Sequence, residues 1–246
     1  MDITNLINPE QFYYGIPANL NGICNIYPKK LKDIAKIGIK NFYTYLNIFT
    51  LELEDIKSFL AQAGITEEIS KFQFHLLNAK NDKIYYSNVI NAFQFFLQEE
   101  NIIILYDSGA IVLGDIKDER IIREEEFNAI CEIVSMQHVV KDTTEQALDN
   151  PSDAVAAKII KQIKEGQKKR NKNKQNSNLS FLDLVDALAA KGNGLNALNI
   201  WELTYYAFNC QFKRMQWIED YEHGFQSLLA GAKKESVNLE HWIRPM

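Results

Sequence analysis

The chain has 246 residues, a formal net charge of −5 and a hydrophobic content of 46%. So much apolar content can build a sizeable core, which excludes disorder throughout, and the length favours one or two domains. The acidic balance argues against a nucleic-acid binder with a broad basic face.

The chain carries neither a secretory signal nor a membrane span by sequence. Asp2 stands where a basic n-region belongs, and no apolar run follows it. The strongest apolar run, Ile102 to Tyr106, has strand length rather than the ~20 residues of a span. The odd number and wide spacing of Cys24, Cys131 and Cys210 argue against disulfides and CxxC metal sites. We expect a cytosolic protein with three reduced, buried cysteines.

Apolar residues through the first hundred positions recur at helical spacing. Residues Leu31 to Phe49 predict one long amphipathic helix after Pro28, which can bend at Gly38. Shorter helices are expected over residues 52–63, after a cap at Thr66, and from Ser87 to Leu97.

The period then changes to that of strands. The runs 102–106 and 110–113 flank Asp107-Ser108-Gly109, which predicts a β-hairpin, and Ile121-Ile122 adds a third short strand. A helix follows from Glu124 to His138, with negative charge in its first turn, where the helix dipole favours it. The N-terminal part, residues 1–142, is therefore predicted as a mostly helical α+β domain with a small antiparallel sheet.

Residues 143–178 read as a helix followed by a basic flexible linker. A helix begins at Pro151 and runs into the basic segment from Lys161 to Lys174. This segment could grip nucleic-acid phosphates, or it could be a solvated tether. We favour the tether, because no aromatic residue within it could stack on bases.

Residues 179–246 predict a helical C-terminal module. One helix begins at Ser180, and a longer one runs from Ile200 to about Leu229 with Asn199 as its cap. Aromatic residues crowd the longer helix on several sides, so it needs cover from a core or from a partner. Our predicted partner-binding residues are Trp201, Tyr205, Phe208, Phe212 and Trp217.

No motif for catalysis is present. The chain lacks a GxxxxGK[ST] or GxGxxG phosphate loop, a GxSxG elbow and an HExxH helix. Glu219 and His223 are four residues apart on a predicted helix, but one histidine beside carboxylates lacks the ligand number of a zinc site. We therefore assign no catalytic residue, no metal and no cofactor, and expect a binding protein rather than an enzyme.

Both ends of the chain resemble tail assembly chaperones of tailed bacteriophages, which are encoded between the major tail protein and the tape measure protein. At the N-terminal end the resemblance is carried by Ile26-Tyr27-Pro28, Leu31-Lys32-Asp33-Ile34 and Ile37-Gly38, with Phe42 and Tyr45-Leu46. At the C-terminal end it is carried by Asn199-Ile200-Trp201-Glu202-Leu203-Thr204-Tyr205-Tyr206, Gln211-Phe212-Lys213-Arg214, Ser227 to Ala232 and Val237 to Trp242.

The resemblance implies a protein of the host cytoplasm that coats the tape measure protein before the tail tube polymerises and is absent from the finished particle. It also implies the tail-tube subunit as a second partner, and homo-oligomers are compatible with it. Two alternatives stay open: a structural component of the virion tail, such as a completion or connector protein, and a nucleic-acid-binding regulator that uses the basic linker.

Overall fold

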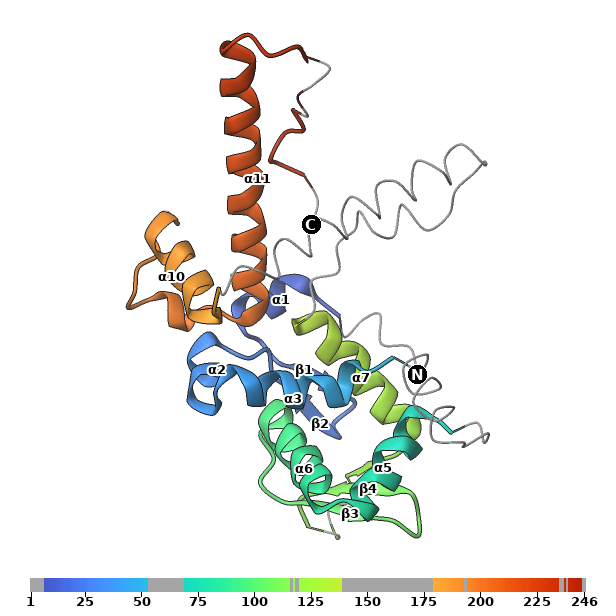
Figure 1. Ribbon diagram of the computed structural model, residues 1–246. Helices are drawn as coiled ribbons and strands as arrows, with labels where there is room; N and C mark the ends of the chain where they lie inside the picture. Colours follow the sequence, from blue (N-terminus) through green and yellow to red (C-terminus); the bar gives the residue numbers. More distant parts are fainter. Residues whose placement is uncertain are drawn as a thin grey trace, which may run out of the picture. The chain divides into compact units, whose positions relative to one another are not determined.

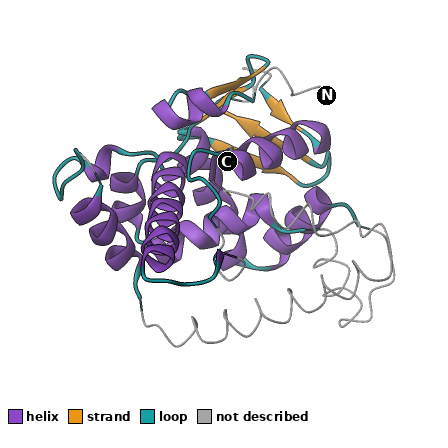
Figure 2. Cartoon of the chain, turned by 90° about the horizontal axis from the view of Figure 1, so that it is seen from above, coloured by secondary structure: helices purple, strands orange, loops and turns teal. Residues whose placement is uncertain are grey.

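The computed structural model describes residues 7–52, 69–115, 117, 120–138, 179–192, 194–234, 237 and 239–244. It confirms a helix-rich α+β protein with a two-stranded and a three-stranded antiparallel sheet, and helices make up most of the described chain in Figure 2. The chain divides into two compact units. The first contains residues 1–139 and 201–209, and the second contains residues 140–200 and 210–246. The sequence had placed residues 201–209 with the C-terminal module.

The first unit begins with a short helix and a hairpin that the sequence analysis missed. Helix α1 (Pro9–Tyr14) is capped by Asn8, whose side chain accepts a hydrogen bond from Glu10 N. Strands β1 (Ala18–Leu20) and β2 (Cys24–Ile26) pair antiparallel around Asn21-Gly22, both with positive φ. An Asn-Gly pair is a strong hairpin signal. It was overlooked because strands of three residues are too short to show a period.

The long helix predicted after Pro28 is instead two helices, α2 (Leu31–Ile37) and α3 (Ile39–Thr50). Gly38, between them, has φ +81° and ψ 145°, a conformation open almost only to glycine. The glycine that was expected to bend one helix therefore ends the first helix and starts the second.

Two further helices, α5 (Lys71–Asn81) and α6 (Lys83–Leu97), follow in the first unit. Ser70 caps α5 through a capping box with Gln73, while the predicted cap Thr66 and helix 52–63 fall mostly outside the described residues. Helix α6 begins before the predicted Ser87, because the Asp82 carboxylate accepts hydrogen bonds from Ile84 N and Tyr85 N.

The predicted hairpin, third strand and following helix are confirmed. Strands β3 (Ile102–Leu105), β4 (Ala110–Leu113) and β5 (Ile121–Ile122) form a sheet in the order β3-β4-β5. Helix α7 (Glu124–His138) follows, and α3 packs against both α6 and α7 (Figure 1). The core of the unit is a cluster of fully buried phenylalanines: Phe42, Phe49, Phe93, Phe96 and Phe127.

The second unit contributes helix α10 (Phe181–Lys191), which Ser180 caps and which was predicted to begin at Ser180. The longer C-terminal helix, α11 (Tyr205–Leu229), belongs to the first unit up to residue 209 and to the second unit from residue 210, and its start differs from the prediction. Residues Ile200–Glu202 form a 3-10 turn, η3, and the α-helix α11 starts only at Tyr205 and ends at Leu229. The cap is Thr204, whose hydroxyl accepts a hydrogen bond from Ala207 N, and not Asn199.

The predicted linker, residues 143–178, lies outside the described residues, so its helix and its basic tether stay predictions. Among the helices that the structure describes, none combines the length and apolar character needed to cross a membrane.

Candidate protein-binding surface

The predicted contact residues fall into two groups by burial. Tyr205 and Phe208 are buried, with 9% and 3% of their surface exposed. Trp201, Phe212 and Trp217 are each partly exposed. The structure therefore leaves three of the five side chains accessible and places the other two in the core.

Tyr205 is held in the first unit from two sides. Its ring lies 5.0 Å from the ring of Phe42 and 6.3 Å from that of His138. Its backbone N–H donates to Lys29 O at 2.7 Å, and its hydroxyl lies 3.5 Å from that of Tyr43. Burial raises the pKa of the Tyr205 hydroxyl, so this side chain is a neutral core group.

The residues just before Tyr205 join the first unit through backbone pairing. Leu31 N donates to Leu203 O at 2.9 Å, and Lys30 and Thr204 form an isolated antiparallel bridge. The Glu202 carboxylate accepts from the ammonium groups of Lys32 and Lys30, and these bonds lower its pKa. Because all three side chains are exposed, the ion pairs add little stability, and the backbone bonds fix the segment.

Behind this segment lies a buried polar pair, Lys29 and His138. His138 Nε2 accepts from Lys29 N at 3.1 Å and Nδ1 donates to Val134 O at 2.9 Å, which requires the neutral, Nδ1-protonated ring. Burial lowers the pKa of His138 to about 3 and that of Lys29 to about 8. The Lys29 ammonium lies over the rings of Tyr27 and Phe95, 5.3 and 4.9 Å from their centroids.

Perturbed pKa values such as those of Lys29 and His138 are common in active sites. Within the described ranges, the pair has neither an adjoining hollow nor a free ring nitrogen. Neither residue lines either of the two surface hollows described below. The imidazole nitrogens are both bonded to the backbone, so neither is available to move a substrate proton. The pair therefore reads as a structural element of the core.

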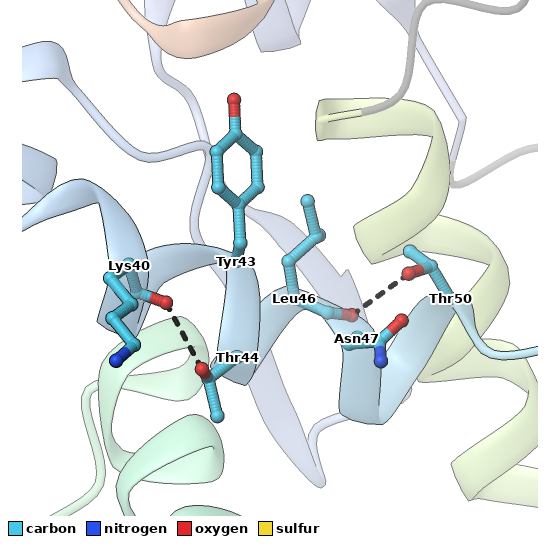
Figure 3. Close-up of a pocket in the computed structure, with 6 residues that line it drawn as sticks. All are labelled: Lys40, Tyr43, Thr44, Leu46, Asn47 and Thr50. Atoms are coloured by element: carbon cyan, nitrogen blue, oxygen red, sulfur yellow. Dashed lines mark hydrogen bonds between the residues drawn. The ribbon is translucent and has the colours of Figure 1, made fainter. Parts of the chain in front are cut away.

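A hollow of about 450 Å³ runs along α3 and is lined by Lys40, Tyr43, Thr44, Leu46, Asn47 and Thr50 (Figure 3). The Thr44 and Thr50 hydroxyls donate to Lys40 O and Leu46 O at 3.0 and 3.1 Å. A hydroxyl bonded within its own helix, with no base beside it, is no activated nucleophile. A second hollow of about 420 Å³ lies beside the start of β3 and also holds no nucleophile–base pair.

No group of three or more metal-ligating side chains occurs among the described residues. The Glu219 carboxylate, weighed above with His223 as a ligand pair, forms an ion pair with Lys191. The geometry of the described residues thus offers no built catalytic or metal site, and the surface of α11 is the main candidate.

From Gln211 to Leu229, α11 contains no buried residue, although it is rich in apolar side chains. Ile218, Tyr221, Phe225 and Leu228 follow each other at spacings of three, four and three, which places them on one helix face. Trp217 and Leu229 border this face, and we call these six residues the distal stripe. Phe225 is 50% exposed and Leu229 is 75% exposed.

Trp217, at the proximal end of the distal stripe, is surrounded by cations. The Lys213 ammonium and the Arg214 and Arg244 guanidinium groups lie 5.2, 5.0 and 4.1 Å from its ring centroid. Cations over an indole face are attracted by its quadrupole, so they hold the ring in place while leaving it partly exposed.

Sequence reasoning found Trp217 but missed the rest of the distal stripe. The signal that could have found it is the three-four-three spacing, which is typical of a helix that packs against another helix. That signal was hidden by the neighbouring aromatic residues, whose burial in the first unit only the structure reveals.

Residues 170–246 match the family model described as the YomV second domain. This is a phage-derived family, since YomV is a Bacillus prophage protein. Neither a curated protein nor a solved structure matches the chain. The C-terminal part of the chain, which contains α10 and α11, is thus similar to a phage protein domain.

Proposed function

We propose that this chain is a phage tail assembly chaperone, which binds the tape measure protein in the host cytoplasm and acts by binding rather than by catalysis. The observation that carries the proposal is the distal stripe, where apolar side chains are exposed or only half-buried over three turns of α11. Exposed apolar patches of this kind mark protein-binding sites.

The client that fits such a surface is an amphipathic helix. A stripe with residues at i, i+3, i+7 and i+10 is the spacing with which one helix lays its apolar face along another. A long, hydrophobic, helical tape measure protein would present many such faces before the tail tube encloses it. The phage-derived match over residues 170–246 supports this context.

Co-expression with the tape measure protein of the same phage tests the proposal. The tape measure protein should be insoluble alone and should co-elute with this chain as a large soluble complex in size-exclusion chromatography with light scattering. A tape measure protein that stays soluble alone and never co-elutes would contradict the proposal. Detection of the chain in purified virions by mass spectrometry would instead favour a structural tail component.

The distal stripe is tested by a double substitution, Phe225→Ser with Leu229→Ser. We expect client binding to weaken at least about tenfold, since about 1.4 kcal/mol of lost apolar contact suffices for this. Because both side chains are exposed, the melting temperature should hardly change. The matched control is Gln216→Ser with Gln226→Ser, two exposed positions elsewhere on α11, which should bind as the wild type does.

A further inference from the structure

The segment that follows α11 folds back onto the same helix. We call residues 237 and 239–244 the tail. Arg214, on α11, donates from one guanidinium nitrogen to Trp242 O and to Arg244 O, the latter at 3.1 Å. The Arg244 guanidinium lies over the Trp217 ring, and the His241 ring lies 5.3 Å from that of Tyr221 at an angle of 60°.

These contacts fall on two residues of the distal stripe, Trp217 and Tyr221. Farther along α11, Phe225 and Leu229 remain exposed. A client helix that lies along the whole stripe would therefore meet open surface at Phe225 and Leu229 and the tail at Tyr221 and Trp217. The tail and the client compete for the same two rings.

The tail is held by contacts that are easily exchanged. It is fixed to α11 by hydrogen bonds from a single side chain and by ring contacts. None of its apolar residues is fully buried: Val237, Leu239 and Trp242 are half-buried, and Ile243 is 67% exposed. The Arg244 Nε is buried without an acceptor in the part of the chain that the structure describes. A segment with no fully buried apolar residue and with an unsatisfied donor opens at low cost in free energy.

We propose that the tail is a displaceable strap, which covers Trp217 and Tyr221 in the free protein and leaves them when the client binds. This inference rests on the proposed function and adds a regulatory contact to it. The client binds the whole distal stripe, from Trp217 to Leu229, only when the tail has left Trp217 and Tyr221. The open fraction of the strap sets the apparent affinity, because a ligand that binds only the open form binds more weakly in proportion to that fraction.

The test compares the full chain with a chain that ends at Lys234. Both carry Trp201→Phe, and the full chain also carries Trp242→Phe, so that Trp217 is the single tryptophan in each. We expect the truncated chain to bind the tape measure protein about tenfold more tightly, as for a strap closed about 90% of the time. Acrylamide should quench Trp217 more strongly in the truncated chain than in the full chain.

Arg214→Gln supplies a second variant that keeps the tail. Its effect in the truncated chain measures the loss of the contact between Arg214 and the Trp217 ring. In the full chain it should tighten client binding relative to that effect, since only there does it also remove the bonds to Trp242 O and Arg244 O. An equal effect in both chains would mean that Arg214 acts on the client directly, which overturns the strap.

The possible failures are distinct. Equal client affinity of the full and truncated chains, or equal quenching of Trp217, overturns the strap and leaves the proposed function standing. Absence of client binding by both chains overturns the proposed function, and the strap as a regulator with it.

Discussion

His75 and His138 are buried in the first unit, and burial lowers the pKa of each to about 3. The unfolded chain takes up a proton at each near pH 6.5, whereas the folded chain does not until about pH 3. Since the unfolded state binds more protons in this window, stability falls as the pH falls below 6.5.

We therefore expect the free energy of unfolding to fall by roughly 2 kcal/mol for each of these histidines between pH 7 and pH 5. Urea titrations at several pH values measure how the free energy of unfolding changes between pH 7 and pH 5. His75→Leu should remove about half of this change, whatever the variant's stability at neutral pH. An undiminished change in this variant would show that His75 is not the group that resists protonation.

Lys29 affects the pH dependence of stability at alkaline pH. Its ammonium is buried, its pKa is lowered to about 8, and the unfolded value is 10.5. Folding is therefore opposed by this group at pH 7, and the penalty disappears as the pH rises from 8 to 10.5. The half-buried Tyr85 and the buried Cys24 have pKa values raised to about 12 from 10.0 and 9.0, so they lower stability as the pH rises above about 10 and 9, which overlaps this range.

Comparing Lys29→Met with the wild type isolates the contribution of Lys29 to the pH dependence of stability, because the contributions of Tyr85 and Cys24 are the same in both proteins. The stability of the variant relative to the wild type should decline by roughly 2–3 kcal/mol between pH 7 and pH 10.5. Denaturant unfolding at the two pH values gives this difference. A constant difference would contradict the assignment of Lys29 as a desolvated cation.

At the scale of elements, caps decided where helices begin. Sequence periodicity located α7 to the residue and the start of α10 to within one residue, because the acidic run Glu124–Glu126 and Ser180 stand where their apolar patterns start. It misplaced α6 and α11, whose caps Asp82 and Thr204 lie away from the first strong apolar repeat. A cap depends on a single residue, whereas an apolar face repeats over many, so the sequence predicts caps less reliably than apolar faces.

The Thr204 side chain forms two hydrogen bonds. Its buried hydroxyl accepts from Ala207 N at 3.0 Å and donates to Tyr13 O at 3.3 Å. Thr204→Val keeps the shape and removes both, so the free energy of unfolding should drop by about 1–3 kcal/mol. Thr44→Val, at an exposed hydroxyl inside α3, is the control, and its cost in thermal melting should be much smaller.

At the scale of the whole molecule, residues 201–209 lie within the stretch that matches the YomV second domain, residues 170–246, but they belong to the first compact unit. A fragment of residues 170–246 would expose Tyr205 and Phe208, and a fragment of residues 1–139 would lose the strand-like pairing at Lys30. We expect both fragments to bind a hydrophobic dye and to melt below the full chain.

A synthetic peptide of residues 199–210 provides the complementary measurement. Added to the 1–139 fragment, it should raise the melting temperature with increasing concentration, since a ligand that binds only the folded state stabilises it. A fragment that melts like the full chain and ignores the peptide would show that the segment contributes nothing to the first unit.

The sequence by itself determined the helix-rich α+β class, the β3-β4 hairpin and the apolar character of α11, because each depends on local spacing and turn chemistry. Only the tertiary structure decided which aromatic residues of α11 are core and which are surface. Tyr205 and Phe208 are buried through contacts and backbone pairing with residues far away in the sequence, such as Lys29 and Phe42. A helical period shows that a face is apolar, but what covers that face is set by distant residues, which no local pattern contains.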